Sequence, residues 1–240
     1  MKTGSLINRI FRWIKSGLMV LLIFVLFNIF LILFFRFIDP ASTAFMYLNI
    51  ENPFLTLIDD DIQYSPTGIS KISVYAPLAV IASEDQKFFD HFGFDFQQIE
   101  KALKENTYRK RKRGASTITM QVAKNLFLVS ERNLIRKGFE AYYTLLIELL
   151  WSKKRIIETY LNIAELGQGI YGIKAASRKF YKKDPIKISQ SEAATIAAVL
   201  PNPKKRNPSR PSRYVIARRG EIIRQMNLIG GTAFIKSNIY

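Results

Sequence analysis

The sequence predicts a mainly α-helical protein in which one N-terminal transmembrane helix precedes a helical domain. Three observations support this fold class. Residues 17–35 form an uncharged apolar run in which Asn28 is the only polar side chain, and a helix of about 20 such residues can cross a bilayer. Beyond residue 75, apolar residues recur at helical spacing in several segments. The alternating pattern of a half-buried strand is sparse along the chain.

A basic tail, residues 1–16, precedes the apolar run and indicates its orientation. Its four cations are accompanied by no acidic residue, and the positive-inside rule keeps such a tail in the cytoplasm. A cleaved signal peptide is the alternative, but it has a shorter apolar core and a small-residue cleavage site that this sequence lacks. We therefore expect a retained single-pass transmembrane helix over residues 17–37, with the rest of the chain outside the membrane.

The chain after this helix divides into two further parts. Prolines and Gly68 interrupt residues 38–74, so we expect a stalk or membrane-proximal segment there. Residues 75–240 form the predicted domain, with a basic loop at 108–113 and a glycine-rich turn at 167–172. The expected helices of this domain cover, approximately, 77–91, 96–106, 117–128, 133–151, 153–165, 173–181, 189–200 and 212–228.

Composition narrows the classes of function. The absence of cysteine excludes disulfides and thiolate metal sites, and the single histidine, His91, excludes a multi-histidine metal centre. The formal net charge of +17 favours an anionic partner, such as nucleic acid, anionic lipid or a phosphorylated ligand. Because the domain is predicted to lie outside the membrane, nucleic acid is not an expected partner.

The first stretch that suggests chemistry begins with the carboxylates Glu84 and Asp85. If the predicted helix continues, Glu84, Phe88 and His91 lie on one helical face. Acidic residues on an apolar face are costly unless they are paired or functional. The alternative is that both carboxylates lie on an exposed helix edge, with Phe88 and Phe89 in the core.

The second stretch is Gly114–Thr117, which leads into a predicted helix. Its free backbone N–H groups and the hydroxyls of Ser116 and Thr117 suit phosphate or diphosphate oxygens. Gln121 and Lys124 follow at a spacing that lets them face the same ligand. The alternative is a structural N-cap that binds nothing.

The third stretch is a cationic cluster around a glutamate. Arg132, Arg136 and Glu140 recur every four residues on one helix face, with Lys137 beside them. Alone, this pattern also describes a surface ladder of ion pairs. Together, the three stretches supply a base for a sugar hydroxyl and cations for a departing diphosphate, as glycosyl transfer from a lipid diphosphate requires.

These stretches resemble the bacterial peptidoglycan glycosyltransferases, a family with a lysozyme-like helical fold. The resemblance continues through Lys154–Glu158, Tyr160–Asn162 and the glycines at 167, 169 and 172. It covers about residues 75–200. The anchor and the length are similar to those of the monofunctional biosynthetic transglycosylases, which lack the transpeptidase domain of their bifunctional relatives. Met120 stands where the family usually has a glutamine, and we expect this position to tolerate the change.

The resemblance implies a substrate and a role for each residue. Lipid II and the growing lipid-linked glycan react to extend a β-1,4-linked strand, with inversion and release of undecaprenyl diphosphate. Glu84 is the implied general base, and Glu140 assists at the departing diphosphate. The implied substrate-binding residues are Asp85, Ser116, Thr117, Gln121, Lys124, Arg132, Arg136 and Lys137.

The resemblance also has implications for cellular location, cofactors and protein partners. The protein is expected in the bacterial inner membrane, with a cytoplasmic N-terminus and a periplasmic catalytic domain. No cofactor and no protein-bound metal are expected, although a divalent ion such as Mg²⁺ can bridge the diphosphate. Other cell-wall synthesis proteins are expected partners. His91, Asn162 and Glu165 are expected to be structural.

Two other classes of protein share parts of this pattern. A lysozyme-like hydrolase would use Glu84 as a general acid, but its neutral leaving group would not need the cationic cluster. A non-catalytic scaffold of the wall-building machinery would need neither the carboxylates nor the cations. An assay on labelled lipid II distinguishes the three classes.

Overall fold

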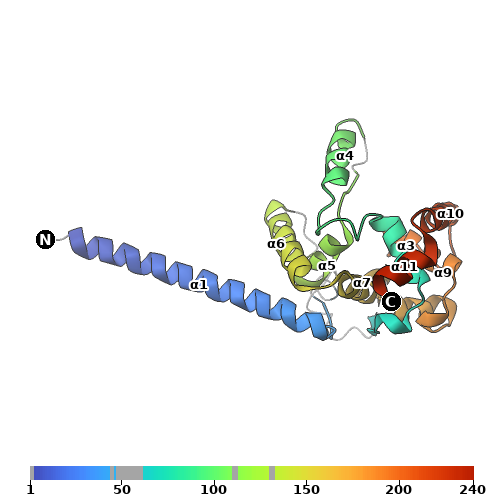
Figure 1. Cartoon of the computed structure of the whole chain (residues 1–240), viewed down its shortest axis with the longest axis horizontal. Helices are drawn as coiled ribbons and strands as arrows, with labels where there is room; N and C mark the ends of the chain where they lie inside the picture. The colour runs from blue at the N-terminus through green and yellow to red at the C-terminus, as the bar shows by residue number, and fades with distance from the viewer. Residues whose placement is uncertain (1–2, 44–45, 47–61, 110–112, 130–132) are drawn as a thin grey trace. The chain divides into compact units, whose positions relative to one another are not determined.

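The structure, a computed structural model, is mainly α-helical, as predicted. The chain divides into two compact units, Met1–Asp39 and Pro40–Tyr240 (Figure 1). Residues 44–45 and 47–61 of the predicted stalk lie outside the residues that the structure describes, which are 3–43, 46, 62–109, 113–129 and 133–240.

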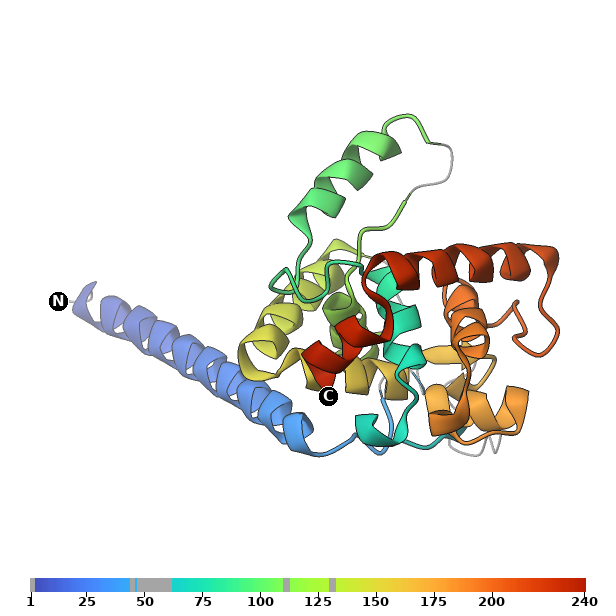
Figure 2. The same ribbon diagram turned by 45° about the vertical axis from the view of Figure 1, so that its right-hand side comes forward.

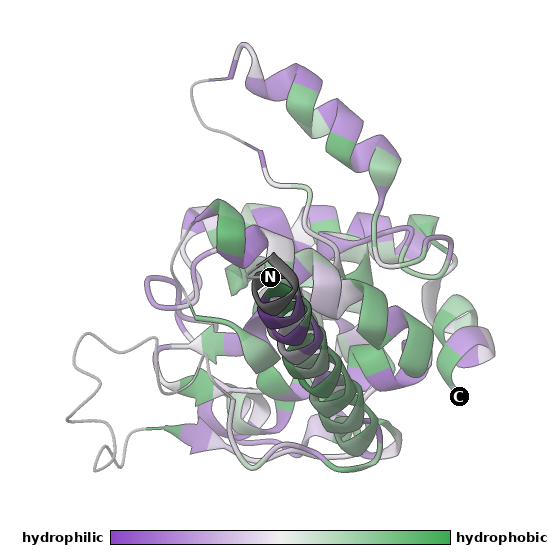
Figure 3. Cartoon of the chain, turned by 90° about the vertical axis from the view of Figure 1, so that its left-hand side faces the viewer, coloured by the Kyte–Doolittle hydropathy of each residue, from purple (hydrophilic) through white to green (hydrophobic). Residues whose placement is uncertain are grey.

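The first unit is formed by helix α1 (Thr3–Phe37). Its segment Asn8–Phe37 is the one helix among the described residues that is long and apolar enough to cross a membrane. Figure 3 shows hydrophobic residues along most of α1 and hydrophilic ones near its N-terminus. Asn28 donates from Nδ2 to the Phe24 carbonyl at 2.7 Å, so part of its polarity is satisfied within the helix. The basic tail is helical from Thr3 onward and continuous with the apolar run.

The second unit is a bundle of helices with a small sheet (Figures 1 and 2). The short helical pieces are η2 (Ile69–Lys71), α8 (Ile173–Ala176), its π-helical continuation η3 (Ser177–Tyr181) and η4 (Pro185–Lys187). The longer helices are α3 (Tyr75–Glu84), α4 (Phe96–Asn106), α5 (Ile118–Phe127), α6 (Leu134–Leu150), α7 (Lys153–Ile163), α9 (Gln190–Val199), α10 (Arg213–Leu228) and α11 (Gly231–Ile239).

The core is built around α3 and α9, which pack against each other. Each of these helices buries seven of its residues, and a helix that is apolar on all sides belongs in the interior. α10 and α11 also pack on α3, while α5 packs on both α6 and α7. Figure 2 shows α4 standing away from the other helices of this unit.

Several helix starts follow from capping residues in the sequence. Thr117, Ser152 and Ser212 accept hydrogen bonds from the first turns of α5, α7 and α10. Ser189 and Glu192 form a capping box at the start of α9. These side chains satisfy backbone N–H groups that the helices leave unpaired, so the predicted starts agree closely with the structure.

The helix predicted over residues 77–91 is wrong beyond Glu84. Asp85 has φ −159° and ψ 74° and ends α3, and residues 86–93 form turns and bends. Glu84, Phe88 and His91 therefore do not share a helical face. Phe88 lies beyond the end of α3 and is completely buried. The apolar spacing therefore reflects burial of this side chain in the core and not a continuing helix.

The predicted glycine-rich turn is part of a three-stranded sheet. Its strands are β1 (Gln63–Tyr64), β2 (Glu165–Gly167) and β3 (Ile170–Tyr171), in the order β1-β3-β2. β3 pairs parallel with β1 and antiparallel with β2. Strands this short carry no alternation that a sequence pattern can reveal.

Gly172, which follows the sheet, is required by its surroundings. Its φ is +83°, and a Cβ at this position would lie 2.3 Å from the Asn162 carbonyl oxygen. Asn162 is itself buried and exchanges two hydrogen bonds with the backbone of Thr67, at 3.0 and 3.1 Å. The expected structural role of Asn162 fits these contacts, which tie α7 to the segment that precedes α3.

Candidate active site

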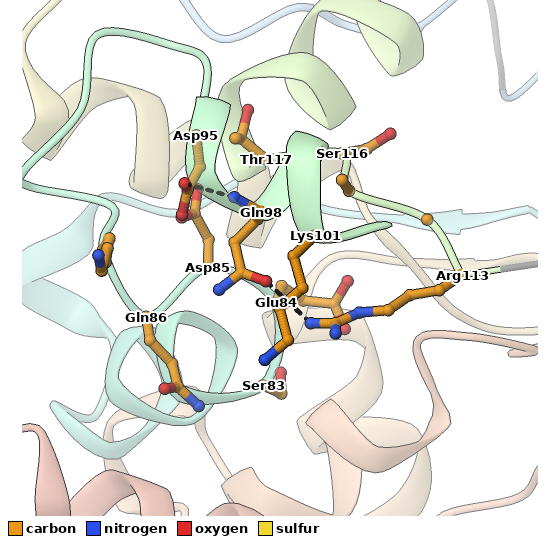
Figure 4. A pocket seen from close by; sticks show the side chains of 13 residues that line it. Ser83, Glu84, Asp85, Gln86, Asp95, Gln98, Lys101, Arg113, Ser116 and Thr117 are labelled. Atoms are coloured by element: carbon orange, nitrogen blue, oxygen red, sulfur yellow. Dashed lines mark hydrogen bonds between the residues drawn. The ribbon is translucent and has the colours of Figure 1, made fainter. Parts of the chain in front are cut away.

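Glu84 is the last residue of α3 and lines a cavity of about 320 Å³ (Figure 4). The opposite wall comes from α4 and from the segment that enters α5. The lining residues are Ser83, Glu84, Asp85, Gln86, Lys87, Asp95, Gln98, Lys101, Arg113, Gly114, Ala115, Ser116 and Thr117.

The surroundings of Glu84 adjust its basicity. Burial raises the pKa of this carboxyl above its ordinary value of 4.5, and the charge of Asp85 adds to this effect. Two groups oppose the rise: the Gln121 amide, which donates from Nε2 to Oε2 at 3.0 Å, and the charge of Arg218. A carboxylate with a raised pKa is a stronger base than a free glutamate.

Asp85 differs from its neighbour in its contacts. One of its oxygens lies 2.8 Å from His91 Nε2, and the other accepts from the Ile118 backbone N–H at 3.0 Å. Asp85 thus joins the end of α3 to the start of α5. It also lines the Glu84 cavity, so its predicted contact with substrate stays a prediction.

We expect His91→Asn to lower thermal stability more than activity. The His91 side chain is largely buried against Asp85, and loss of a buried hydrogen bond to a charged group costs about 2–3 kcal/mol. For a domain of this size the melting temperature should fall by roughly 4–10 °C. Calorimetry and a polymerisation assay at low temperature would measure both effects. Unchanged melting with lost turnover would assign His91 to the chemistry instead.

The hydroxyls of Ser116 and Thr117 lie in different surroundings. Thr117 Oγ1 accepts from the Met120 N–H at 3.2 Å and donates to the Gly93 carbonyl at 2.6 Å, so its hydroxyl is engaged by the protein. Ser116 is exposed and lines both the Glu84 cavity and a second cavity beside it. Of the two hydroxyls, that of Ser116 is the better placed for a ligand.

The second cavity, of about 470 Å³, brings together the remaining predicted residues that the structure describes. It shares Arg113, Gly114 and Ser116 with the first cavity, so the two adjoin. Met120 also lines it although only 5% exposed. The other lining residues are Gln121, Lys124, Arg136, Lys137 and Glu140.

Glu140 is not part of a surface ladder, because only 3% of the residue is exposed. Arg136 Nη1 donates to one carboxylate oxygen at 2.6 Å, and Lys137 donates to the other. A buried carboxylate is costly unless it is paired, and here two cations that line the cavity provide the pairing. Arg132, the third predicted cation, lies outside the described residues.

A network of buried and half-buried polar groups supports the segment that carries Asp85 and His91. Lys153 Nζ donates to Glu148 at 2.8 Å and to the His91 carbonyl at 2.7 Å, and it lies 4.6 Å from the centre of the Phe88 ring. Thr119 donates to the same Glu148 oxygen at 2.5 Å. The network links α5, α6 and α7 to the segment that carries His91.

Gly93 lies where this segment approaches α6. Its φ is +76°, and a Cβ there would lie 2.8 Å from Thr144 and 3.0 Å from Glu148. Only glycine allows both the backbone conformation and this close approach.

Two arginines of the site were not among the predicted site residues. Arg113 lines both cavities and donates to Gln98 at 2.9 Å and to Glu105 at 3.1 Å, but in the sequence it is the last residue of a basic run. Arg218 donates to the Ser83 carbonyl at 3.4 Å from α10. Its distance along the chain from Glu84 leaves no local pattern that could have identified it.

Comparisons with known proteins agree with this geometry. The sequence model of the Transglycosylase family matches residues 52–227. Three similar proteins are each named biosynthetic peptidoglycan transglycosylase. That of Bacteroides thetaiotaomicron is 44% identical over 223 residues, which cover 93% of this chain and 89% of the relative. That of Pseudomonas putida is 47% identical over 215 residues, covering 90% and 91%. That of Yersinia pseudotuberculosis is 53% identical over 171 residues, covering 71% of each chain.

The extent of these matches decides the family. The family model covers well over half of the chain, and relatives above 40% identity align along most of both sequences. The two adjoining cavities hold the carboxylates and cations that glycosyl transfer requires. The chain therefore belongs to the transglycosylase family and is a peptidoglycan glycosyltransferase.

Proposed function

We propose that the protein polymerises lipid II into β-1,4-linked glycan strands and releases undecaprenyl diphosphate. The observation that carries this proposal is the arrangement of two carboxylates in adjoining cavities that share Arg113, Gly114 and Ser116. In the first cavity Glu84 accepts a hydrogen bond from the neutral Gln121 amide, whereas in the second cavity Glu140 accepts from the cations Arg136 and Lys137. This asymmetry suits an attacking hydroxyl on one side and a departing diphosphate on the other.

In this proposal, Glu84 accepts the proton of the 4-hydroxyl of an incoming lipid II. The oxygen attacks the anomeric carbon of the growing chain while the bond to the diphosphate breaks on the opposite face. The α-linked donor thereby becomes a β-linked product, so the reaction inverts the anomeric centre.

The departing diphosphate is stabilised on the Glu140 side in the same proposal. Lys124, Arg136 and Lys137 line that cavity, and cations placed where negative charge develops lower the barrier. Glu140 holds Arg136 and Lys137 in position. The proposal requires no resident metal, and a divalent ion such as Mg²⁺ can add to these cations by bridging the diphosphate.

We also propose a topology and a division of labour. α1 is the membrane anchor, with a cytoplasmic N-terminus and a periplasmic catalytic unit in the inner membrane. This orientation rests on the cations of the N-terminal tail. In this division of labour, separate transpeptidases among the cell-wall synthesis proteins form the cross-links between peptide stems.

The full chain, purified in detergent and supplied with labelled lipid II, tests the proposed reaction. The expected product is a long glycan that a muramidase cuts into uncross-linked disaccharide units. A parallel reaction with a chelator shows whether a divalent ion contributes. Breakdown of added glycan without synthesis would indicate a hydrolase, and no reaction on either substrate would indicate a scaffold; both would refute the proposal.

A further inference from the structure

We propose that Tyr160 is a positioning residue that acts through Gln121 to keep Glu84 as a proton acceptor. This inference rests on the proposed role of Glu84 as the general base. It concerns a tyrosine that is only 1% exposed and lines neither of the two cavities.

Three helices contribute one residue each to a short hydrogen-bonded chain. Tyr160 of α7 donates its hydroxyl proton to Gln121 Oε1 at 3.1 Å. Gln121 of α5 donates from Nε2 to Glu84 Oε2 at 3.0 Å. Glu84 ends α3 at the cavity, so the chain runs from the core to the reactive carboxylate.

The chemistry of the three groups favours one order of donors and acceptors in these hydrogen bonds. An ionised carboxylate only accepts hydrogen bonds, so Gln121 must turn its amide nitrogen toward Glu84 and its oxygen toward Tyr160. Tyr160 must then donate. Among the described contacts, Gln121 is the partner recorded for this hydroxyl, so the tyrosine proton has one acceptor.

Protonation of Glu84 weakens these hydrogen bonds in either orientation of the Gln121 amide. If Gln121 keeps its orientation, it donates to a neutral acid, and such a bond is about half as strong as one to a charged group. If the amide turns over, its nitrogen faces Tyr160, and the buried hydroxyl proton loses its acceptor. A buried donor without a partner is costly. The Tyr160 hydroxyl thus favours the ionised form of Glu84, against the effect of burial.

The donor itself does not titrate in the working range. Burial raises the pKa of Tyr160 well above its ordinary value, and the charges of Glu84 and Asp85 add to this. The hydroxyl therefore keeps its proton at acidic and neutral pH.

Other charged groups around Glu84 are retained when Tyr160 is changed. Asp85 and Arg218 act on Glu84 directly. The remaining ionisable groups are those lining its cavity and those on helices packed against α3: Lys87, Asp95, Lys101, Arg113, Lys153, Lys154, Arg155, Glu158, Glu192, Arg213, Arg219, Glu221, Arg224 and Lys236.

Tyr160→Phe removes the hydroxyl and keeps the ring in the core. The measurement is kcat/KM for lipid II polymerisation by the full chain across pH. Activity that needs a general base is lost as pH falls through the pKa of that base. A higher pKa of Glu84 therefore moves the acidic limb of the pH–activity profile, the part where activity falls with falling pH, to higher pH. We expect a shift of about 0.5–1 pH unit, or about three- to tenfold lower activity on that limb, with a plateau changed less than about threefold.

Two further variants separate positioning from general damage. Tyr171→Phe alters another buried tyrosine, on β3, that lines neither cavity, and it should leave the limb in place. Gln121→Met removes the link itself, so Tyr160→Phe should cause no further shift in that background. Gln121→Met should by itself move the limb upward, which tests the chain even if Tyr160→Phe fails to fold.

The outcomes are distinct. An unmoved limb in Tyr160→Phe or in Gln121→Met, or an equal loss of activity at every pH, would overturn the positioning role. A shift from Tyr160→Phe that persists in the Gln121→Met background would show that Tyr160 does not act through Gln121. An unmutated protein that does not polymerise lipid II would refute the proposed function instead.

Discussion

Glu84→Gln should lower polymerisation of lipid II by about 10²–10⁴-fold, the usual contribution of a general base. The amide has nearly the same shape as the carboxylate, but it cannot accept the hydroxyl proton. Glu84 lies at the end of α3, where one oxygen contacts Gln121, so the fold should tolerate the change. Polymerisation kinetics with labelled lipid II, together with a direct binding measurement, would show turnover lost and binding kept.

A matched control for this change is Glu100→Gln. Glu100 lies on α4 with a side chain that is 66% exposed and is paired with Lys104, so the same chemical change there should leave turnover unaltered. If a folded Glu84→Gln protein polymerises at a near-normal rate, Glu84 has no part in the chemistry.

Arg136→Met should lower polymerisation by about 10²–10³-fold, since removal of one group that stabilises developing negative charge typically costs that much. Arg136 lines the second cavity and pairs with buried Glu140. Methionine keeps much of the apolar length of the side chain, and Lys137 remains as a partner for Glu140. The loss should therefore appear in kcat rather than in stability.

Arg178→Met provides the matched control. Arg178 also pairs with a carboxylate, Asp184, but its side chain is 60% exposed and lines neither cavity. The same substitution there should change neither kcat nor the melting temperature measurably. A modest change in kcat for Arg136→Met, comparable to this control, would place the departing diphosphate elsewhere.

Local sequence patterns predicted much of the fold because local forces decide those features. Serine and threonine caps mark the starts of α5, α7, α9 and α10, and apolar spacing locates the helices between them. The pattern failed at Asp85, where α3 ends although Phe88 and Phe89 continue the helical spacing. Packing in the folded unit instead buries Phe88 completely and covers part of Phe89, whose ring contacts that of the distant Phe234.

The candidate site was predictable where its residues lie close together in sequence. Glu140, Arg136 and Lys137 meet because one helix turn separates them. The spacing could not show that Glu140 is buried, since burial depends on elements packed around α6. Arg218 and Tyr160 were inaccessible to such reasoning, because each meets the site only through tertiary packing.

The packing of α3 against the last helices of the chain has a consequence for biosynthesis. Helix α3 is the first long helix that the structure describes in the catalytic unit, and α9, α10 and α11 pack against it. Contacts between such distant segments form only after the intervening chain exists, and they slow folding. With α1 as the proposed membrane anchor, a nascent chain can insert this helix long before Arg218 has been synthesised. We therefore expect the growing polypeptide to be tethered to the bilayer before it is catalytically competent, and to become competent only when its final helices fold.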